Sequence, residues 1–133
     1  MTTLEPDQMP TTQKTILLVE DKLSNITTMM DYLKAKGYQV FVAVNGKEGV
    51  ETAQAQQPHL ILMDIQMPEM DGLEAIEMIR RDPVIGRTPI IALTALAMTG
   101  DRERCLRAGA NEYVSKPVRL KELIQLIEKI LAK

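Results

Sequence analysis

The chain has one cysteine, no tryptophan and no long apolar run. Cys105 has no second cysteine to pair with, which fits a reducing compartment, and we expect it to be a small buried residue on a helix. No segment approaches the ~20 apolar residues of a membrane-spanning helix. The first residues lack the apolar stretch of a signal peptide. These absences predict a cytoplasmic protein with no membrane partner.

The composition also lacks a strong excess of either charge. Sixteen Lys and Arg residues stand against 18 Asp and Glu residues, so the net charge of −2 gives no general attraction to nucleic acid. The apolar fraction of 45% is typical of a globular protein, and 133 residues suffice for one domain. Residues 1–14 are polar and contain Pro6 and Pro10, which predicts a flexible leader before a domain over 15–133.

Five short apolar runs predict strands that are covered on both faces. They are followed by stretches with helical periodicity, of which Ile26, Met29, Met30 and Leu33 form one example. The predicted strands are 16–19, 40–44, 60–63, 90–93 and 113–114. The predicted helices contain Ile26 to Leu33 with a stop at Gly37, Asn45 to Ala53, Leu73 to Ile79, Thr99 to Gly109, and Leu120 to Leu131.

Strict alternation of strands and helices predicts an α/β fold with a parallel sheet and right-handed crossovers. Helices then cover both faces. Five strands are too few for an eight-stranded barrel, so we expect the flavodoxin-like strand order 2-1-3-4-5. Asn45 followed by Glu48 resembles a capping box and predicts where the second helix begins.

Polar residues follow four of the predicted strands. Glu20 and Asp21 follow the first, Asp64 the third, Thr94 the fourth, and Lys116 lies just beyond the fifth. Ligands of open parallel sheets bind at the carboxyl ends of strands, where the strand order reverses. Each residue alone is more often a cap, turn residue or solvated charge. Together they predict one site.

The predicted site has the chemistry of phosphoryl transfer. Carboxylates without histidine or cysteine favour Mg²⁺ or Mn²⁺, and such a cation would neutralise their repulsion. Lys116 would supply a positive charge and Thr94 a hydroxyl donor for the transferred group. A carboxylate nucleophile, a metal ion and a lysine together indicate an aspartyl phosphate intermediate.

The sequence at these positions resembles the receiver domains of bacterial response regulators, both chemotaxis-type single-domain regulators and receivers of hybrid kinases. The resemblance covers residues 15–132 and is specific because several motifs occur in order. The motifs are ILLVED (16–21), LILMDIQMPEMDG (60–72), PIIALTA (89–95), GA (109–110) and YVSKP (113–117).

The resemblance implies that Asp64 accepts a phosphoryl group from a histidine kinase or histidine phosphotransfer protein. Asp21, Asp64 and the main-chain carbonyl of Gln66 would ligate Mg²⁺, with Glu20 acting through water. The first position of the family's frequent Asp-Asp pair is occupied here by Glu20.

The resemblance also implies a conformational switch. Lys116 would pair with the phosphoryl oxygens, Thr94 would bond one of them, and Tyr113 would be the aromatic switch residue. The Lys116-Pro117 bond would be cis. Downstream proteins would read the surface formed by the fourth helix, fifth strand and fifth helix, where Leu126 widens the apolar arc of the last helix.

Other interpretations remain open at this point. A phosphatase or phosphotransferase resembling the haloacid dehalogenases needs a second aspartate two residues after the nucleophile, but that position is Gln66. A nucleotide or flavin carrier would need a glycine-rich loop after the first strand, and none is present. A degenerate, binding-only receiver would not need the complete Asp, Thr and Lys set. We therefore expect a signalling module, not an enzyme.

Two further features have ordinary explanations. His59 could suggest a phosphoryl relay, but a surface position at the start of a strand is the better interpretation. Arg102, Arg104 and Arg107 could form a docking patch, but a solvated helix face is the better interpretation.

Overall fold

Strands and helices alternate along the whole described chain, as the apolar pattern predicts. The computed structural model describes residues 13–67, 70–95 and 100–132. The strands are β1 (Thr15–Val19), β2 (Gln39–Ala43), β3 (Leu60–Asp64), β4 (Ile90–Thr94) and β5 (Glu112–Ser115). The helices are α1 (Leu23–Ala35), α2 (Gly46–Gln56), α3 (Gly72–Arg81), α4 (Asp101–Ala108) and α5 (Leu120–Leu131).

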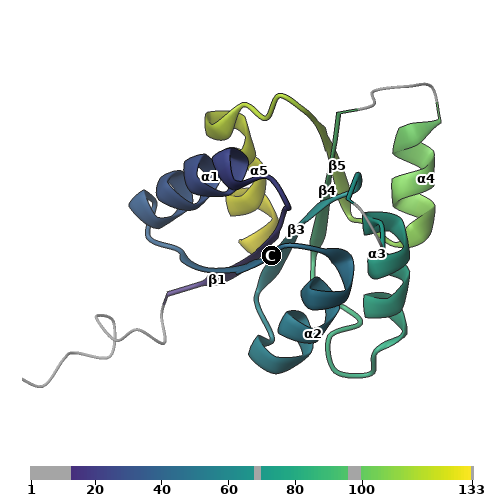
Figure 1. Ribbon diagram of the computed structural model, residues 1–133. Coiled ribbons are helices and arrows are strands. Elements are labelled where there is room, and N and C mark those ends of the chain that lie inside the picture. The colour runs from purple at the N-terminus through teal and green to yellow at the C-terminus, as the bar shows by residue number, and fades with distance from the viewer. Residues whose placement is uncertain (1–12, 68–69, 96–99, 133) are drawn as a thin grey trace, which may run out of the picture.

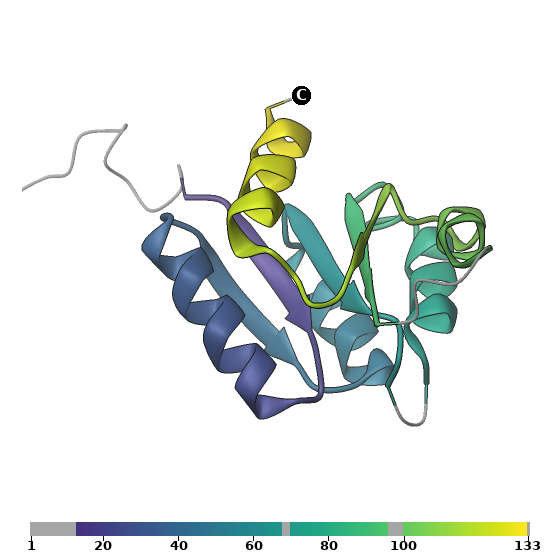
Figure 2. The same ribbon diagram turned by 90° about the horizontal axis from the view of Figure 1, so that it is seen from above.

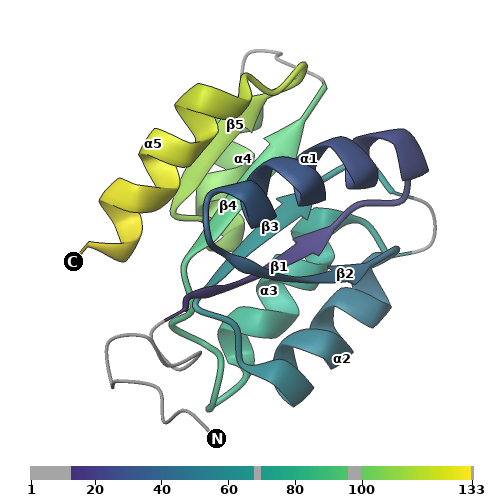
Figure 3. The same ribbon diagram turned by 90° about the vertical axis from the view of Figure 1, so that its left-hand side faces the viewer.

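The five strands form one parallel sheet in the order β2-β1-β3-β4-β5, which confirms the predicted topology. Helices α1 and α5 cover one face, and α2, α3 and α4 cover the other (Figures 1 and 2). Figure 3 shows α1 and α5 side by side in front of the sheet. The order reverses between β1 and β3, so the carboxyl ends of these two strands define the switch point.

Each face of the sheet has its own hydrophobic core because side chains alternate along a strand. Val50 of α2 and Ile76 of α3 belong to one core, and Leu33 of α1 and Ile127 of α5 belong to the other. All five residues of β3 are buried, as expected for a central strand. Burying one such aliphatic side chain contributes about 1.5–3 kcal/mol. The central strands are therefore packed on both faces by the two cores.

Local signals place most helix ends correctly. Glu48 N–H donates to Asn45 Oδ1 at 2.8 Å, which confirms the predicted cap of α2. Gly37 follows α1 and Gly109 follows α4, and both have positive φ angles, +95° and +122°, which glycine adopts at little cost. Thr99, the expected cap of the fourth helix, lies outside the described residues.

Strand and helix boundaries differ slightly from the prediction at β2. Its predicted run ends at Val44, but the strand ends at Ala43 and Val44 is 44% exposed.

The last two residues of the predicted leader, Gln13 and Lys14, contact the folded domain. Gln13 Nε2 donates to the Gly37 carbonyl, and the Lys14 carbonyl accepts from Gln39 N–H. Residues 1–12 of the predicted leader lie outside the described part of the chain.

Two smaller expectations are confirmed. The Lys116-Pro117 peptide bond is cis. Cys105 is 2% exposed on α4, and burial raises the pKa of its thiol. Within the described residues, every helix is too short or too polar to cross a lipid bilayer.

Candidate functional site

Strand register brings the predicted site residues to one edge of the sheet. Val19 pairs with Met63, so Glu20 and Asp64 follow in adjacent positions. Thr94 pairs with Ser115, and Lys116 N–H donates to the Thr94 carbonyl at 2.7 Å. By alternation, Glu20, Asp64 and Lys116 lie toward the face covered by α1 and α5, whereas Thr94 lies toward α3 and α4.

Asp64 is a buried carboxylate at the end of β3, with only 1% of its surface exposed. Its Oδ1 accepts from Gln66 N–H at 3.1 Å, and its Oδ2 lies 3.2 Å from Lys116 Nζ. The start of α3 lies directly against it, because a Cβ at Gly72 would collide with the Asp64 carbonyl. One oxygen of Asp64 is therefore held by a main-chain N–H group, and the other by the Lys116 ammonium.

Glu20 is fully buried and accepts four hydrogen bonds. Its Oε2 accepts from the N–H groups of Asp21 and Lys22, at 2.9 and 3.3 Å. Its Oε1 accepts from Asn25 Nδ2 and from Lys116 Nζ, each at 3.1 Å. Lys116 thus lies between two buried carboxylates, Glu20 and Asp64.

The charges of the three groups are strongly coupled through these contacts. Burial and the neighbouring Glu20 carboxylate raise the pKa of Asp64 to about 6. Burial also acts to raise the pKa of Glu20, but the side-chain interaction with Asp64 and the hydrogen bond from the Lys116 ammonium outweigh it and lower the value to about 2. Burial acts to lower the pKa of Lys116, yet contacts with Glu20 and Asp64 raise it overall. One lysine therefore only partly compensates the acidic groups.

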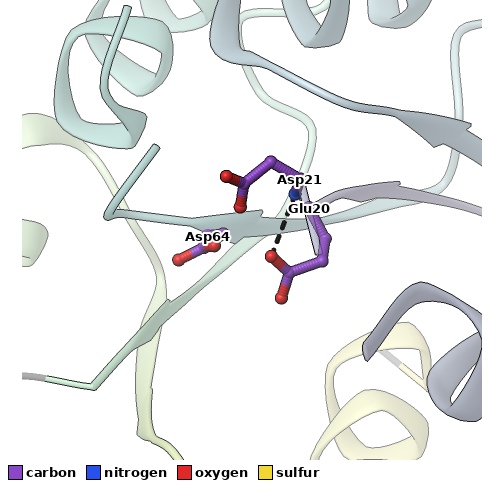
Figure 4. Close-up of side chains that lie close together, drawn as sticks. All are labelled: Glu20, Asp21 and Asp64. Atoms are coloured by element: carbon purple, nitrogen blue, oxygen red, sulfur yellow. Dashed lines mark hydrogen bonds between the residues drawn. The ribbon is translucent and has the colours of Figure 1, made fainter. Parts of the chain in front are cut away.

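Glu20, Asp21 and Asp64 form the acidic cluster that the sequence predicts (Figure 4). One carboxylate oxygen from each lies within 4.8 Å of the others. Asp21 Oδ1 is buried and has no hydrogen-bond partner within the described residues. A buried unpaired carboxylate oxygen is unfavourable, and a divalent cation would satisfy it. The donor set therefore fits Mg²⁺ or Mn²⁺.

Gln66 links the loops that follow β3 and β4. Its main-chain N–H donates to Asp64 Oδ1, and its side-chain Oε1 accepts from Ala95 N–H at 2.9 Å.

Thr94 is 1% exposed and lines a cavity of about 210 Å³. The other lining residues are Ile65, Gln66, Asp71, Leu73, Asp101 and Arg104. The Thr94 side chain thus belongs to the α3 and α4 side of the site.

The predicted switch residue Tyr113 is half-buried at the edge strand β5. Its ring packs against the core under α3 and α4. It also lines a cavity of about 470 Å³ together with Leu126 of α5 and Lys116. Tyr113 therefore contacts both the core and the surface that the resemblance assigns to downstream partners.

His59 lies at the opposite end of the sheet from Asp64. It precedes β3, and Asp64 is the last residue of this five-residue strand, so about 16 Å of extended chain separates them. The His59 Nδ1 accepts from Thr15 N–H at 3.0 Å. Arg102, Arg104 and Arg107 are exposed on α4. The ordinary interpretations of these residues agree with the structure.

Asn25 is a site residue that sequence reasoning missed. It lies in the first turn of α1, and its amide reaches the buried Glu20 carboxylate. The only sequence signal was a side-chain donor shortly after an acidic strand end, which is also typical of solvated helix starts.

Comparisons with known proteins identify the family to which the chain belongs. The family model of the response regulator receiver domain matches residues 16–128. The polar-differentiation response regulator DivK of Brucella anthropi is 39% identical over 118 residues, which cover 89% of this chain and 96% of that protein.

Solved structures give the same result. The receiver domain of the Pseudomonas aeruginosa sensor histidine kinase PA1611, described with a magnesium ion in its active site cleft, has a TM-score of 0.85 and 40% identity. The match covers 91% of this chain and 99% of that one. The chemotaxis protein CheY4 of Vibrio cholerae has a TM-score of 0.84 and 26% identity, over 89% and 98% of the two chains. The chain therefore belongs to the response regulator receiver family of two-component signalling.

Proposed function

We propose that this receiver domain accepts a phosphoryl group on Asp64 from a phosphohistidine of a histidine kinase or histidine phosphotransfer protein. An Asp64 carboxylate oxygen forms the new bond to phosphorus. The nitrogen–phosphorus bond of the donor breaks, and its electron pair leaves with the imidazole nitrogen, which takes up a proton. The observation that carries this proposal is a buried carboxylate at the switch point with a lysine ammonium 3.2 Å away.

Asp21, Asp64 and the Gln66 main-chain carbonyl would hold Mg²⁺, with Glu20 beside them through water. The bound cation would neutralise the carboxylates and stabilise the charge that develops on the phosphoryl oxygens. Lys116 lies beside the acceptor oxygen and would pair with the transferred group. The buried, unpartnered Asp21 Oδ1 supports the metal assignment.

The site supports a signalling module better than a phosphatase that turns over many substrates. Such an enzyme needs an acid two residues after the nucleophile, and Gln66 occupies that position with its side chain bonded to Ala95 N–H. We propose that residues 15–133 are the receiver unit and that it acts in the cytoplasm.

Phosphorylation of Asp64 would shift the far side of the domain through Thr94. A phosphoryl group carries a charge of about −1.5 to −2 and strong acceptor oxygens. Thr94, at the end of the neighbouring strand, would turn to donate to it, and half-buried Tyr113 would move into the space beside Ala95. Two states separated by only a few kcal/mol would make this switch reversible. The α4, β5 and α5 face would carry the signal to a protein target.

This switch predicts a specific pattern of amide chemical shifts. Beryllofluoride with Mg²⁺, which mimics the phosphoryl group, should shift signals of α4 and Tyr113 in the wild-type protein. The Thr94→Ala variant should keep the shifts near Asp64 and lose those of α4. Wild-type shifts confined to the metal edge would refute the switch, and α4 shifts that survive in Thr94→Ala would remove Thr94 from it.

Phosphoryl transfer itself should depend on the cation. Incubation with a small phosphodonor and Mg²⁺ should add one phosphoryl group per chain, as measured by intact mass under conditions that preserve acyl phosphates. Chelation of Mg²⁺ should reduce the rate by at least about 100-fold, because the cation stabilises the transition-state charge. Equal labelling with and without chelator would contradict the metal assignment.

A further inference from the structure

We infer that Asn25 is a positioning residue for phosphoryl transfer: its side-chain amide holds the Glu20 carboxylate, and through it keeps the Lys116 ammonium beside Asp64. This inference rests on the proposed function, because it assigns a supporting role at the same site. It adds a residue of α1 to a set that otherwise comes from strand ends. The role is mediated, since Asn25 bonds Glu20 and not the acceptor.

The contacts form an uninterrupted chain from α1 to the acceptor. Asn25 Nδ2 donates to Glu20 Oε1 at 3.1 Å, and Lys116 Nζ donates to the same oxygen at 3.1 Å. Lys116 Nζ then lies 3.2 Å from Asp64 Oδ2. Asn25 and Lys116 therefore donate to the same oxygen, and the position of that oxygen fixes where the ammonium can sit.

Asn25 controls the half of the carboxylate that faces Lys116. The other oxygen, Glu20 Oε2, is held by the main-chain N–H groups of Asp21 and Lys22 at the start of α1. Because both main-chain donors bind Oε2, the Glu20 carboxylate can still rotate about that oxygen, and Oε1 can move. The Asn25 amide closes this freedom because α1, which packs on the core through Met29 and Leu33, carries it.

The flexibility of the two long side chains makes such a support necessary. Glutamate and lysine each lose substantial rotamer freedom when they are held in one geometry. Glu20 is fully buried, so its carboxylate depends on hydrogen bonds from protein donors, and the loss of one of them is unfavourable. Without the Asn25 amide, we expect the Glu20 carboxylate to rotate and Lys116 to follow it away from Asp64. The acceptor would then lose part of the positive charge that favours phosphoryl transfer.

A merely structural role for Asn25 would leave Lys116 in place. Replacing a residue that hydrogen-bonds and orients a metal-site residue typically changes affinity or activity by 10- to 100-fold. Replacing a helix-surface asparagine that has no such role changes only the stability of the fold, and by a small amount. The environment of Lys116 in the unmodified protein therefore separates the two roles.

The test compares Asn25→Ala and Asn25→Asp with a matched control, Thr28→Ala. Asn25→Asp keeps the shape but replaces the donor with an acceptor facing Glu20. Thr28 lies farther along α1 and lines the same cavity of about 450 Å³ as Glu20, Asn25 and Lys116. The first readout is the set of Lys116 Cε and Hε NMR signals in Mg²⁺-free protein, assigned with Lys116→Arg. We expect these signals to move in both Asn25 variants and to stay in place in Thr28→Ala.

The second readout is the rate of Mg²⁺-dependent labelling by a small phosphodonor. We expect about a tenfold loss in Asn25→Ala and at least that in Asn25→Asp, and less than about a twofold change in Thr28→Ala. In a Glu20→Ala background, Asn25→Ala should cause no further loss, because the residue acts through Glu20.

Unmoved Lys116 signals in Asn25→Ala would overturn the inference, as would an undiminished loss of rate in the Glu20→Ala background. Absence of labelling in the wild-type protein would instead overturn the proposed function. The Lys116 signals would still test the positioning of the ammonium in that case, since they are measured without phosphodonor.

Discussion

In Mg²⁺-free buffer at pH 7, replacing Asp64 with asparagine should raise the free energy of unfolding by on the order of 3 kcal/mol. Burial and Glu20 raise the Asp64 pKa from 3.8 to about 6 in the folded protein. Each unit of such a shift corresponds to about 1.4 kcal/mol at a pH where the group is ionised in both states. Asparagine removes this charge and keeps an oxygen that can accept from Gln66 N–H.

The effect should have a defined pH dependence. Folding raises the Asp64 pKa from 3.8 to about 6, so the protonated carboxyl group favours the folded state. This contribution to stability is complete below pH 3.8 and is lost as the pH rises through about 6. The wild-type protein should therefore become more stable as pH falls from 7 to 5. The Asp64→Asn variant should lack this gain. Below about pH 4.5 the lowered pKa of Glu20 acts in the opposite direction, and stability should fall toward pH 2.

Urea unfolding between pH 5 and 7 measures both effects. Asp31→Asn, which removes an exposed carboxylate of α1, is the matched control and should leave the stability nearly unchanged. A destabilised Asp64→Asn variant, or a wild-type protein whose stability does not rise on mild acidification, would contradict the description of Asp64 as an unfavourably buried charge.

Mg²⁺ should stabilise the folded protein, and the Asp21→Ala variant should lose most of this response. A cation that binds only the folded state adds about 2.7 kcal/mol at 100 times its dissociation constant. Asp21 supplies the buried, unpartnered oxygen of the acidic cluster, so its loss removes a ligand that no main-chain contact replaces. Thermal unfolding across a Mg²⁺ titration measures the change.

Two controls separate binding from general screening. NaCl at matched ionic strength should give a much smaller shift, because screening does not satisfy a specific oxygen. Asp31→Ala should respond to Mg²⁺ as the wild-type protein does. A similar Mg²⁺ shift in Asp21→Ala and wild type would show that the cation binds elsewhere.

The fold was largely predictable because its signals are local and repeated. The run 60–63 is apolar at every position, which is the pattern of a central strand that helices cover on both faces. In the structure every residue of β3 is buried. The Asn45 and Glu48 pair likewise predicted a helix start from two residues. Val44 was misassigned to a strand because an apolar run does not show where an edge strand leaves the sheet.

The strand-end residues were predictable for a similar reason. Parallel strands place their carboxyl ends at one edge, so Glu20, Asp21 and Asp64 had to lie close together once the strand order was known. The side of the sheet on which Thr94 lies also follows from alternation, although its cavity near Asp101 and Arg104 depends on how α4 packs.

Contacts that depend on how helices and loops pack against the sheet could not be predicted. The bond from Asn25 to Glu20 requires α1 to begin close to the end of β1, and the bond from Ala95 N–H to Gln66 requires two loops to meet. Both are set by the packing of helices on the sheet, which residue types and spacing do not encode. The shared position of Lys116 between two acids arises in the same way.

The most direct test of the account is the location of the phosphoryl group. The wild-type protein is labelled with a small phosphodonor and Mg²⁺, the acyl phosphate is trapped by reduction, and the modified residue is identified by peptide mass spectrometry. We expect modification at Asp64, and none in Asp64→Asn, while Asp71→Asn is labelled like the wild type. Labelling of another residue in the wild-type protein, or undiminished labelling of Asp64→Asn, would contradict it.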